Sequence, residues 1–319
     1  MYIIPTLLLG VFIGWYSRSW LDLPGQLRPS LVRENSGEYN FINPLLLVTG
    51  IEESPDFATL KKNVDSYITD SIKKNSAISI SAYFQDLNSG NWTGVNEDVV
   101  YGPSSMLKVA VMVGYLKEAS TNPKLLSEKL KYTHKETNLQ NYPPEHFLEN
   151  DFYTVKELIE SMIVNSDNDS LESLYTHNRK AYINVFKELD ISPPLATTTI
   201  DFMSPRIYSR IFRTLYSSTY LPRIISEQAL QLLSNTNFKK GLAAQLPKNI
   251  TVAHKFGEHT AKDSVGKTLF VELHDCGIIY YPEKPYLLCI MTKGNEFVKL
   301  ESVISDISLI TYGYIKNSK

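Results

Sequence analysis

The stretch YGPSSMLKVAVMVGYL, residues 101–116, combines an apolar helical pattern with two serines at its start and a lysine one turn further on. A lysine inside an apolar helix loses its hydration, so it is tolerated when it is paired or has a chemical role. Ser105 and Lys108 have the spacing that places a hydroxyl and an amine on one helix face, where a neutral amine could accept the serine proton. Gly102 and Pro103 place Ser105 at a helix start, where its backbone N–H is free to bind an oxyanion.

The Ser-x-x-Lys spacing alone is weak evidence, because Ser71 and Lys74 repeat it on a helix whose lysines are expected to face water. The two pairs differ in their surroundings. Lys108 is embedded in the apolar run MLKVAVMV, where desolvation would lower its pKa. We therefore predict that Ser105 and Lys108 form the reactive pair.

Two further patterns lie downstream, and each is weak when taken singly. Ser-Asp-Asn at 166–168 could simply cap a helix, and Lys255 with Gly257 could mark a strand with a bulge or a close backbone approach. In chain order, however, Ser-x-x-Lys, Ser-Asp-Asn and Lys-x-Gly resemble the motif set of the class A β-lactamases and penicillin-binding proteins. The resemblance extends over residues 57–319.

The resemblance implies a role for each matching catalytic position. Ser105 would attack the carbonyl of a β-lactam or of a D-alanyl-D-alanine-type peptide, with Lys108 as the candidate base. Ser166 would relay a proton to the leaving nitrogen. Lys255 would attract the substrate carboxylate and help to keep Lys108 neutral, and Asn168 would hold the substrate amide.

The resemblance also implies three further substrate-binding positions. The backbone N–H groups of Ser105 and Glu258 would form an oxyanion hole. Gly257 completes the third motif, and Tyr142 lies where these enzymes often have a tyrosine in the wall of the site. No cofactor and no metal is expected, because His254, His259 and His274 lack a clear carboxylate or cysteine partner in the sequence.

The chain departs from the family pattern in the segment that should carry the deacylating glutamate. The β-lactamases hydrolyse their acyl-enzyme with an Ω-loop glutamate in a Glu-x-x-x-Asn setting, and no such setting is found after Asn168. This segment is about a dozen residues shorter than in the family. The available carboxylates are those of Asp169, Glu172, Glu188, Asp190 and Asp201. Asp201 is the least unsuitable substitute. Without the glutamate, hydrolysis of the acyl-enzyme is expected to be slow.

The second departure is Phe256, which stands where the family usually has a threonine or serine whose hydroxyl contacts the substrate carboxylate. The affinity for ordinary β-lactams is expected to suffer from this change.

The remaining pattern predicts an α/β protein of the α+β kind. Residues 57–72 have helical apolar spacing, a hairpin is centred on 88–91, and strand signals recur at 249–257, 268–281 and 285–294. A helical pattern then extends to residue 315. The resemblance implies a β-lactamase/transpeptidase-like fold: a five-stranded antiparallel sheet flanked by N- and C-terminal helices, with an all-helical subdomain inserted between strands.

Cys276 and Cys289 lie in apolar segments on either side of the last turn. They are expected to be buried free thiols, because adjacent strands seldom supply the geometry of a disulfide.

The N-terminus predicts a domain layout of three parts. Residues 1–20 read as a membrane anchor or signal segment, 21–55 as a linker and 56–319 as the hydrolase domain. An uncleaved anchor is favoured over a removed signal, since no small-x-small cleavage site comes after the apolar run. Arg18 and Arg33, with a third arginine between them, favour a cytoplasmic side for the domain, which conflicts with its expected extracytoplasmic location.

These observations predict a membrane-anchored acyl-serine hydrolase that acts on a β-lactam or a peptidoglycan peptide, as a slow β-lactamase or a D,D-peptidase. The alternative is a binding module that recognises cell-wall peptide on the same fold without turnover. Nucleic acid is excluded as a partner, because the net charge is -2 and the lysines are spread along the chain.

Overall fold

The computed structural model describes residues 30–33, 39–49, 53–133, 140–142, 151–191 and 201–318. Its centre is a five-stranded sheet in the order β4-β3-β9-β8-β7, and every neighbouring pair is antiparallel. The strands are β3 (Ser79–Asp86), β4 (Trp92–Val95), β7 (Val252–Lys262), β8 (Thr268–Ile279) and β9 (Tyr286–Gly294). The predicted hairpin and the three later strands are thereby confirmed.

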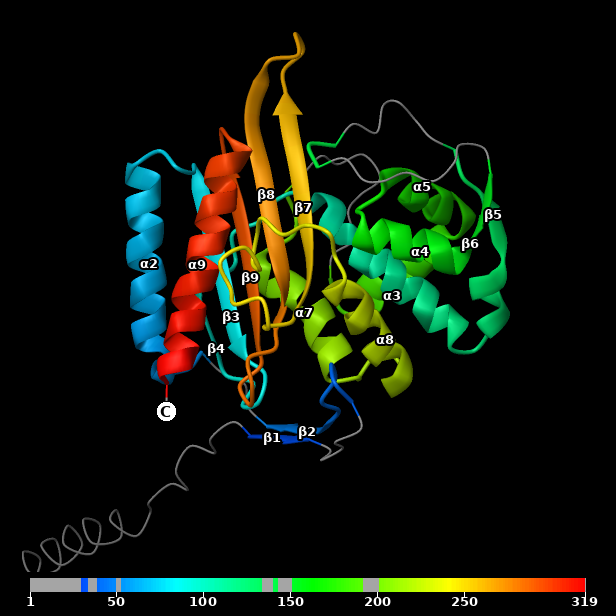
Figure 1. Ribbon diagram of the computed structural model, residues 1–319, viewed down its shortest axis with the longest axis horizontal. Coiled ribbons are helices and arrows are strands. Elements are labelled where there is room, and N and C mark those ends of the chain that lie inside the picture. The colour runs from blue at the N-terminus through cyan, green and yellow to red at the C-terminus, as the bar shows by residue number, and fades with distance from the viewer. Residues whose placement is uncertain are drawn as a thin grey trace, which may run out of the picture.

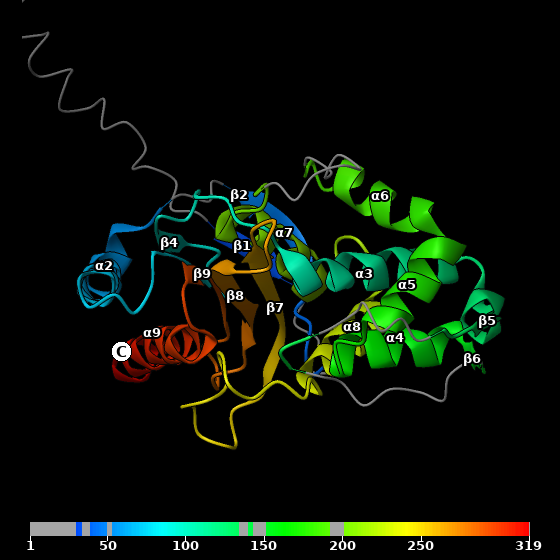
Figure 2. The same ribbon diagram turned by 90° about the horizontal axis from the view of Figure 1, so that it is seen from above.

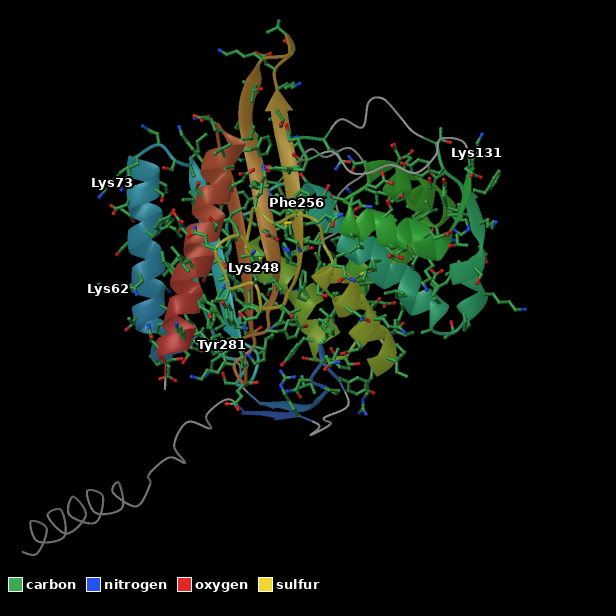
Figure 3. The ribbon with its side chains drawn as sticks, viewed as in Figure 1. Lys62, Lys73, Lys131, Lys248, Phe256 and Tyr281 are labelled. Atoms are coloured by element: carbon green, nitrogen blue, oxygen red, sulfur yellow. A yellow bond between two sulfur atoms is a disulfide. The ribbon has the colours of Figure 1, made fainter. Side chains whose placement is uncertain are left out.

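Two long helices, α2 (Ala58–Lys73) and α9 (Phe297–Asn317), lie side by side over one face of this sheet (Figure 1). Lys62 and Lys73 project from α2 away from the sheet, as the amphipathic pattern predicts (Figure 3). The pattern is wrong at two apolar positions, since Ile72 is 39% exposed near the end of α2 and Val298 is 68% exposed at the start of α9. Both lie in the terminal turns, where a helix has fewer neighbours to cover it.

The chain between β4 and β7 forms the helical part of the molecule on the other side of the sheet (Figure 2). Its helices are α3 (Lys108–Ala119), α4 (Val155–Val164), α5 (Asn168–His177), α6 (Arg179–Glu188), α7 (Pro205–Tyr216) and α8 (Arg223–Ser234). Thr154 and Glu157 form a reciprocal capping box at the start of α4. The insertion is not wholly helical, because β5 (Lys129–Lys131) pairs with β6 (Phe152–Thr154) at its far end.

The expected linker over residues 21–55 is partly structured. β1 (Ser30–Arg33) and β2 (Leu45–Thr49) form an antiparallel ribbon. The ribbon is tied to the domain by backbone N–H groups, since Asn43 donates to Tyr216 O at 2.8 Å and Leu45 donates to Ser217 O at 3.0 Å. The predicted membrane segment, 1–20, lies outside the described residues. Within the part of the chain that the structure describes, no helix is both long and apolar enough to cross a membrane.

Cys276 and Cys289 are joined by a disulfide, so the expectation of two free thiols is wrong. The register of β8 and β9 explains the difference, because it places the two residues directly opposite each other with their Cα atoms 4.0 Å apart. The turn that joins the two strands sets this register, and the cysteine spacing alone does not reveal it.

Candidate active site

Ser105 lies on a short 3-10 helix, Ser104–Leu107, that leads directly into α3. Ser104 has a φ of 49°, a left-handed conformation that costs energy for a residue with a side chain. Met106 N donates to Pro103 O at 3.0 Å and closes the turn. The turn leaves the Ser105 side chain partly exposed at the end of a buried helix.

Lys108 is fully buried and its ammonium nitrogen lies among oxygens of two chain segments. Its Nζ is 3.0 Å from Ser105 Oγ, 3.1 Å from Ser166 Oγ and 2.7 Å from Asn168 Oδ1. It also donates to the backbone O of Ser166 at 2.6 Å. The structure therefore brings the first two sequence motifs into direct contact.

Ser166 links this group to the third motif. Lys255 Nζ donates to Ser166 Oγ at 2.8 Å, so one hydroxyl lies between two lysines. Ser166 and Lys255 are both fully buried, and Ser166 has a φ of 59°. A left-handed residue in a buried polar cluster is typical of positions that the surrounding structure holds under strain for function.

Burial lowers the pKa of Lys108 to about 7, and this effect prevails over the nearby carboxylates of Asp167, Glu258 and Asp169, which raise it. Burial also lowers the pKa of Lys255 well below its ordinary value, and the neighbouring charge of Lys108 lowers it further. Two ammonium groups that share one hydroxyl repel each other, so the arrangement favours at least one neutral amine near neutral pH.

Asp167 holds this segment in place, and it is the helix cap that the sequence offered as one reading of the second motif. It caps the start of α5, where its carboxylate accepts from Asp169 N at 3.0 Å. It also accepts from the hydroxyls of Ser161 at 3.1 Å and Ser170 at 2.6 Å. These bonds fix the backbone on both sides of Ser166 and supply the hydrogen-bond partners that a buried carboxylate needs.

Gly257 lets strand β7 approach the turn that carries Ser105. A Cβ atom at this position would lie 2.6 Å from Pro103 O and 2.9 Å from Met106 Cγ, which is too close for any side chain. The close approach places the backbone of Glu258, the next residue, beside the Ser105 turn. This is the arrangement that the expected pair of backbone oxyanion donors requires.

Residues 140–142 cover one side of the site, through contacts that the sequence did not predict. The Gln140 side-chain amide donates to Ser166 O at 2.9 Å. The Glu258 carboxylate accepts from Asn141 N at 3.0 Å and from Tyr142 N at 3.2 Å. No local signal in the sequence identifies Gln140, because its partner Ser166 lies 26 residues further along the chain.

Tyr142, which was expected in the wall of the site, belongs to an aromatic cluster around Phe256. Phe256, which Figure 3 labels, is 3% exposed, and its ring stacks on Phe238 with centroids 4.1 Å apart. The Tyr142 ring contacts Phe256 edge-on at 5.6 Å, and its hydroxyl donates to Glu301 Oε1 on α9 at 2.6 Å. The Nζ of Lys255 lies 4.2 Å from the centre of the Phe256 ring.

This aromatic cover, Tyr142, Phe238 and Phe256, changes the chemistry offered by the third motif. The ammonium of Lys255 faces an aromatic ring where a hydroxyl would otherwise help to bind an anion. Phe256 was identified from the sequence as a departure, but its partner Phe238 was not.

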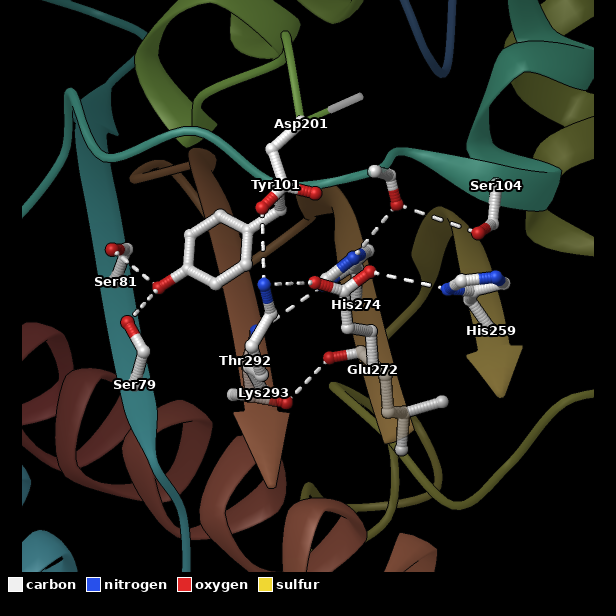
Figure 4. A network of polar contacts seen from close by, with 12 residues as sticks. Ser79, Ser81, Tyr101, Ser104, Asp201, His259, Glu272, His274, Thr292 and Lys293 are labelled. Carbon is white, nitrogen blue, oxygen red and sulfur yellow. Dashed lines mark hydrogen bonds and ion pairs between the residues drawn. The ribbon is translucent and has the colours of Figure 1, made fainter. Parts of the chain in front are cut away.

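A second polar network lies behind the Ser105 turn (Figure 4). His274 Nε2 is 3.1 Å from Gly102 O, and its Nδ1 accepts from Thr292 N at 3.2 Å. Burial lowers the pKa of His274 to about 4, so the ring is neutral and its Nε2–H donates to the turn. Lys293 Nζ is 3.0 Å from both Asp201 Oδ2 and Glu272 Oε1.

In this network Lys293 donates a hydrogen bond to Asp201. The carboxylates that raise the pKa of Lys108 belong to Asp167, Glu258 and Asp169, not to Asp201. Asp201 is therefore poorly placed as a substitute for the Ω-loop glutamate. The two histidines that flank the third motif have carboxylate neighbours: His254 Nδ1 is 2.8 Å from Asp275, and His259 Nδ1 is 3.6 Å from Glu272. In the described part of the chain, no three His, Cys, Asp or Glu side chains are arranged so that they could hold a metal ion.

The sequence matches the family described as the beta-lactamase enzyme family over residues 63–315. A curated relative, beta-lactamase VEB-1 of Pseudomonas aeruginosa, is 20% identical over 268 residues, which cover 76% of this chain and 87% of that protein.

Solved structures repeat the same architecture. The structure of PBP-A matches with a TM-score of 0.70 and 20% identity, over 85% of this chain and 100% of that chain. A mutant of PBP-A, solved as an acyl-enzyme complex with penicillin G, matches with a TM-score of 0.68 and 19% identity, over 82% and 97% of the two chains. These matches confirm the β-lactamase/transpeptidase-like fold predicted from the motifs.

Proposed function

The chain belongs to the beta-lactamase enzyme family, and we propose that it is a serine hydrolase in which Ser105 forms an acyl-enzyme with a β-lactam or a D-alanyl-D-alanine-type peptide. The observation that carries this proposal is the buried Lys108, whose Nζ is 3.0 Å from the partly exposed Ser105 Oγ. A base with a pKa of about 7 is matched to proton transfer near neutral pH.

In the acylation step, Ser105 Oγ bonds to the carbonyl carbon of the substrate and its proton passes to the neutral Nζ of Lys108. The carbonyl oxygen becomes an oxyanion, which the backbone N–H groups of Ser105 and Glu258 stabilise. The tetrahedral centre collapses as the bond from carbon to nitrogen breaks. The nitrogen needs a proton, and Ser166 Oγ is positioned to pass one from either lysine.

Release of the acyl group is proposed to be slow. It requires a water activated by a base, and Asp167, the first of the carboxylates that act on Lys108, is already bonded to Ser161, Ser170 and Asp169. Asp201 is held by Lys293. This arrangement favours penicillin-binding behaviour over rapid β-lactam turnover, and the solved acyl-enzyme of a PBP-A mutant offers a structural parallel.

One observation favours the alternative of a cell-wall peptide binding module. The aromatic cover lies over Lys255, which weakens the expected attraction for a substrate carboxylate. A protein that binds peptide without turnover would still show the fold but would form no covalent product at Ser105.

We also propose that the hydrolase domain acts outside the cytoplasm, anchored through residues 1–20. The disulfide between Cys276 and Cys289 supports this location, because disulfides persist in oxidising compartments. Protease added to cells whose outer envelope has been removed should degrade the domain, whereas protection of the domain until the cytoplasmic membrane is opened would contradict the location.

The experiment that tests the proposed activity is intact-protein mass spectrometry of the full chain over time after addition of benzylpenicillin. A stable adduct would show acylation without efficient release, and a transient adduct with hydrolysed drug would show a β-lactamase. If no adduct forms with penicillin or with a D-alanyl-D-alanine thioester, the hydrolase proposal is wrong and the binding module remains.

A further inference from the structure

A cavity of about 450 Å³ lies apart from the candidate active site, between the β1–β2 ribbon, the end of β3, the C-terminus of α6 and α7. Figure 2 shows the ribbon beside α7. We call this cavity the arginine pocket, because Arg33, Arg210 and Arg213 line it. Its volume falls in the range of small-molecule sites.

Arg33 enters the pocket from β1, where it donates hydrogen bonds to neutral backbone groups and has the Asp86 carboxylate as a charged neighbour. Its two terminal nitrogens donate to the backbone oxygens of Asn43 at 2.5 Å and Leu87 at 2.7 Å, and its guanidinium lies 5.1 Å from the centre of the Tyr216 ring. Its Nε is buried and has no hydrogen-bond partner among the described residues. Burial lowers the pKa of Arg33 from its ordinary value, which is the mark of a partly desolvated charge.

Arg213 enters the same pocket from α7 and also has an N–H group without an acceptor. Its Nε is also buried without a hydrogen-bond partner, and no carboxylate of the described residues forms an ion pair with it. Both arginines are half-buried, and a buried N–H of a guanidinium that has no acceptor is costly for a folded protein. Two such groups at one cavity are the feature that requires an explanation.

The acidic groups around the pocket already have other partners. Glu188 Oε2 accepts from the Tyr220 hydroxyl at 2.5 Å. Asp190 is exposed, and its carboxylate lies 3.9 Å from Arg210. Arg210 is therefore paired with a carboxylate of the wall. Among the described residues, no carboxylate of the wall forms an ion pair with Arg33 or Arg213.

The wall of the pocket also contains an orphaned acceptor and an apolar surface. Gln85 is 2% exposed, and its Nε2 donates to Gly90 O at 2.6 Å, whereas its Oε1 is buried without a hydrogen-bond partner. Leu45, Leu87 and Leu189 supply apolar surface. The pocket thus offers unused N–H donors, one unused acceptor and a hydrophobic wall.

We propose that the arginine pocket binds a small organic carboxylate that has an apolar body and a hydroxyl or N–H donor. The carboxylate accepts from Arg33 and Arg213, because a guanidinium matches the planar geometry of a carboxylate better than an ammonium does. The body lies against the leucines, and the donor of the ligand reaches Gln85 Oε1. This site is independent of turnover at Ser105.

The test is isothermal titration calorimetry of the full chain with hydroxynaphthoate, and with hydroxynaphthamide as its neutral counterpart. The unmodified protein should bind the acid about tenfold more tightly than the amide. Arg213→Met should weaken binding of the acid about tenfold, and Arg33→Met should do the same. Arg206→Met is the matched control, because Arg206 lies on α7 with Arg213 but pairs with Asp98 outside the pocket.

Equal affinity for acid and amide would overturn the proposal, since it would show an apolar cavity without charge recognition. Wild-type affinity in Arg213→Met, or no binding of the acid by the unmodified chain, would also overturn it. Circular dichroism checks that each variant folds. If the methionine variants do not fold, the comparison of acid and amide on the unmodified chain decides the matter, and Arg213→Lys tests whether the guanidinium itself is needed.

Discussion

The chain contains the same Ser-x-x-Lys spacing in two helical regions with opposite environments. At the end of α2, Ser71 is buried and Lys74 is exposed. At the start of α3, Ser105 is partly exposed and Lys108 is fully buried. The spacing supplies proximity in both places, but only the second arrangement desolvates the amine and leaves the hydroxyl accessible to a substrate. Burial, rather than the motif, separates a reactive pair from a solvated one.

Removing the two serines separately should give the largest difference between the two pairs. Ser105→Ala is expected to abolish covalent labelling by a fluorescent penicillin, because the nucleophile is lost. Ser71→Ala is the matched control and should label at the wild-type rate. Gel fluorescence measures both, and labelling of Ser105→Ala at the wild-type level would show that the reactive residue lies elsewhere.

Substitution of the two lysines should change the acylation rate to very different extents. Lys108→Met keeps an unbranched side chain that lacks the amine, and it should slow acylation by about 10²- to 10⁴-fold, the usual contribution of a positioned base. Lys74→Met should leave the rate unchanged. Stopped-flow measurement with a chromogenic cephalosporin gives both rates, and equal rates for the two variants would remove Lys108 from the mechanism.

The pH dependence of acylation tests the environment of Lys108 directly. Below a pKa of about 7 the amine is protonated and cannot accept the Ser105 proton, so the rate should fall as the pH falls. Between pH 8 and pH 5 the expected loss is about hundredfold, or tenfold for each unit below the pKa. A rate that keeps rising above pH 9 would indicate a lysine with an ordinary pKa, like an exposed one.

The aromatic cover should have the smallest effect. Phe256→Thr opens the face of Lys255 and adds a hydroxyl, so acylation by benzylpenicillin should become about tenfold faster. The loss of a buried ring from the stack on Phe238 should cost about 3 kcal/mol of unfolding free energy, which urea denaturation measures. Phe256→Leu keeps the cover apolar and is the control. A threonine variant that is no faster than the leucine variant would contradict a blocking role.

Much of the fold could be predicted, because its signals lie in neighbouring residues. The periodicity of α2, the turn between β3 and β4, and the capping box at Thr154 are all local. The β1–β2 ribbon could not be predicted, since it is held by Tyr216 and Ser217, which lie far along the sequence. The disulfide depends on strand register in the same way.

The site shows the same division. The motifs identified the lysines and serines that the structure brings within hydrogen-bond distance. Gln140 and Phe238 could not be found in advance, because each contacts the site from a segment without a repeating pattern. The stack of Phe256 on Phe238, which places its ring in the aromatic cover, could not be predicted for the same reason.

The aromatic cover can be lost through a single mutation. Phenylalanine and serine codons can differ at a single base, and serine is small enough to uncover Lys255 while it supplies a hydroxyl at position 256. A single base change could therefore remove the ring that covers Lys255. Because release of the acyl group is proposed to be slow, a Phe256→Ser protein would be acylated and inactivated sooner, so populations that carry this gene and grow under penicillin are expected to keep phenylalanine at position 256.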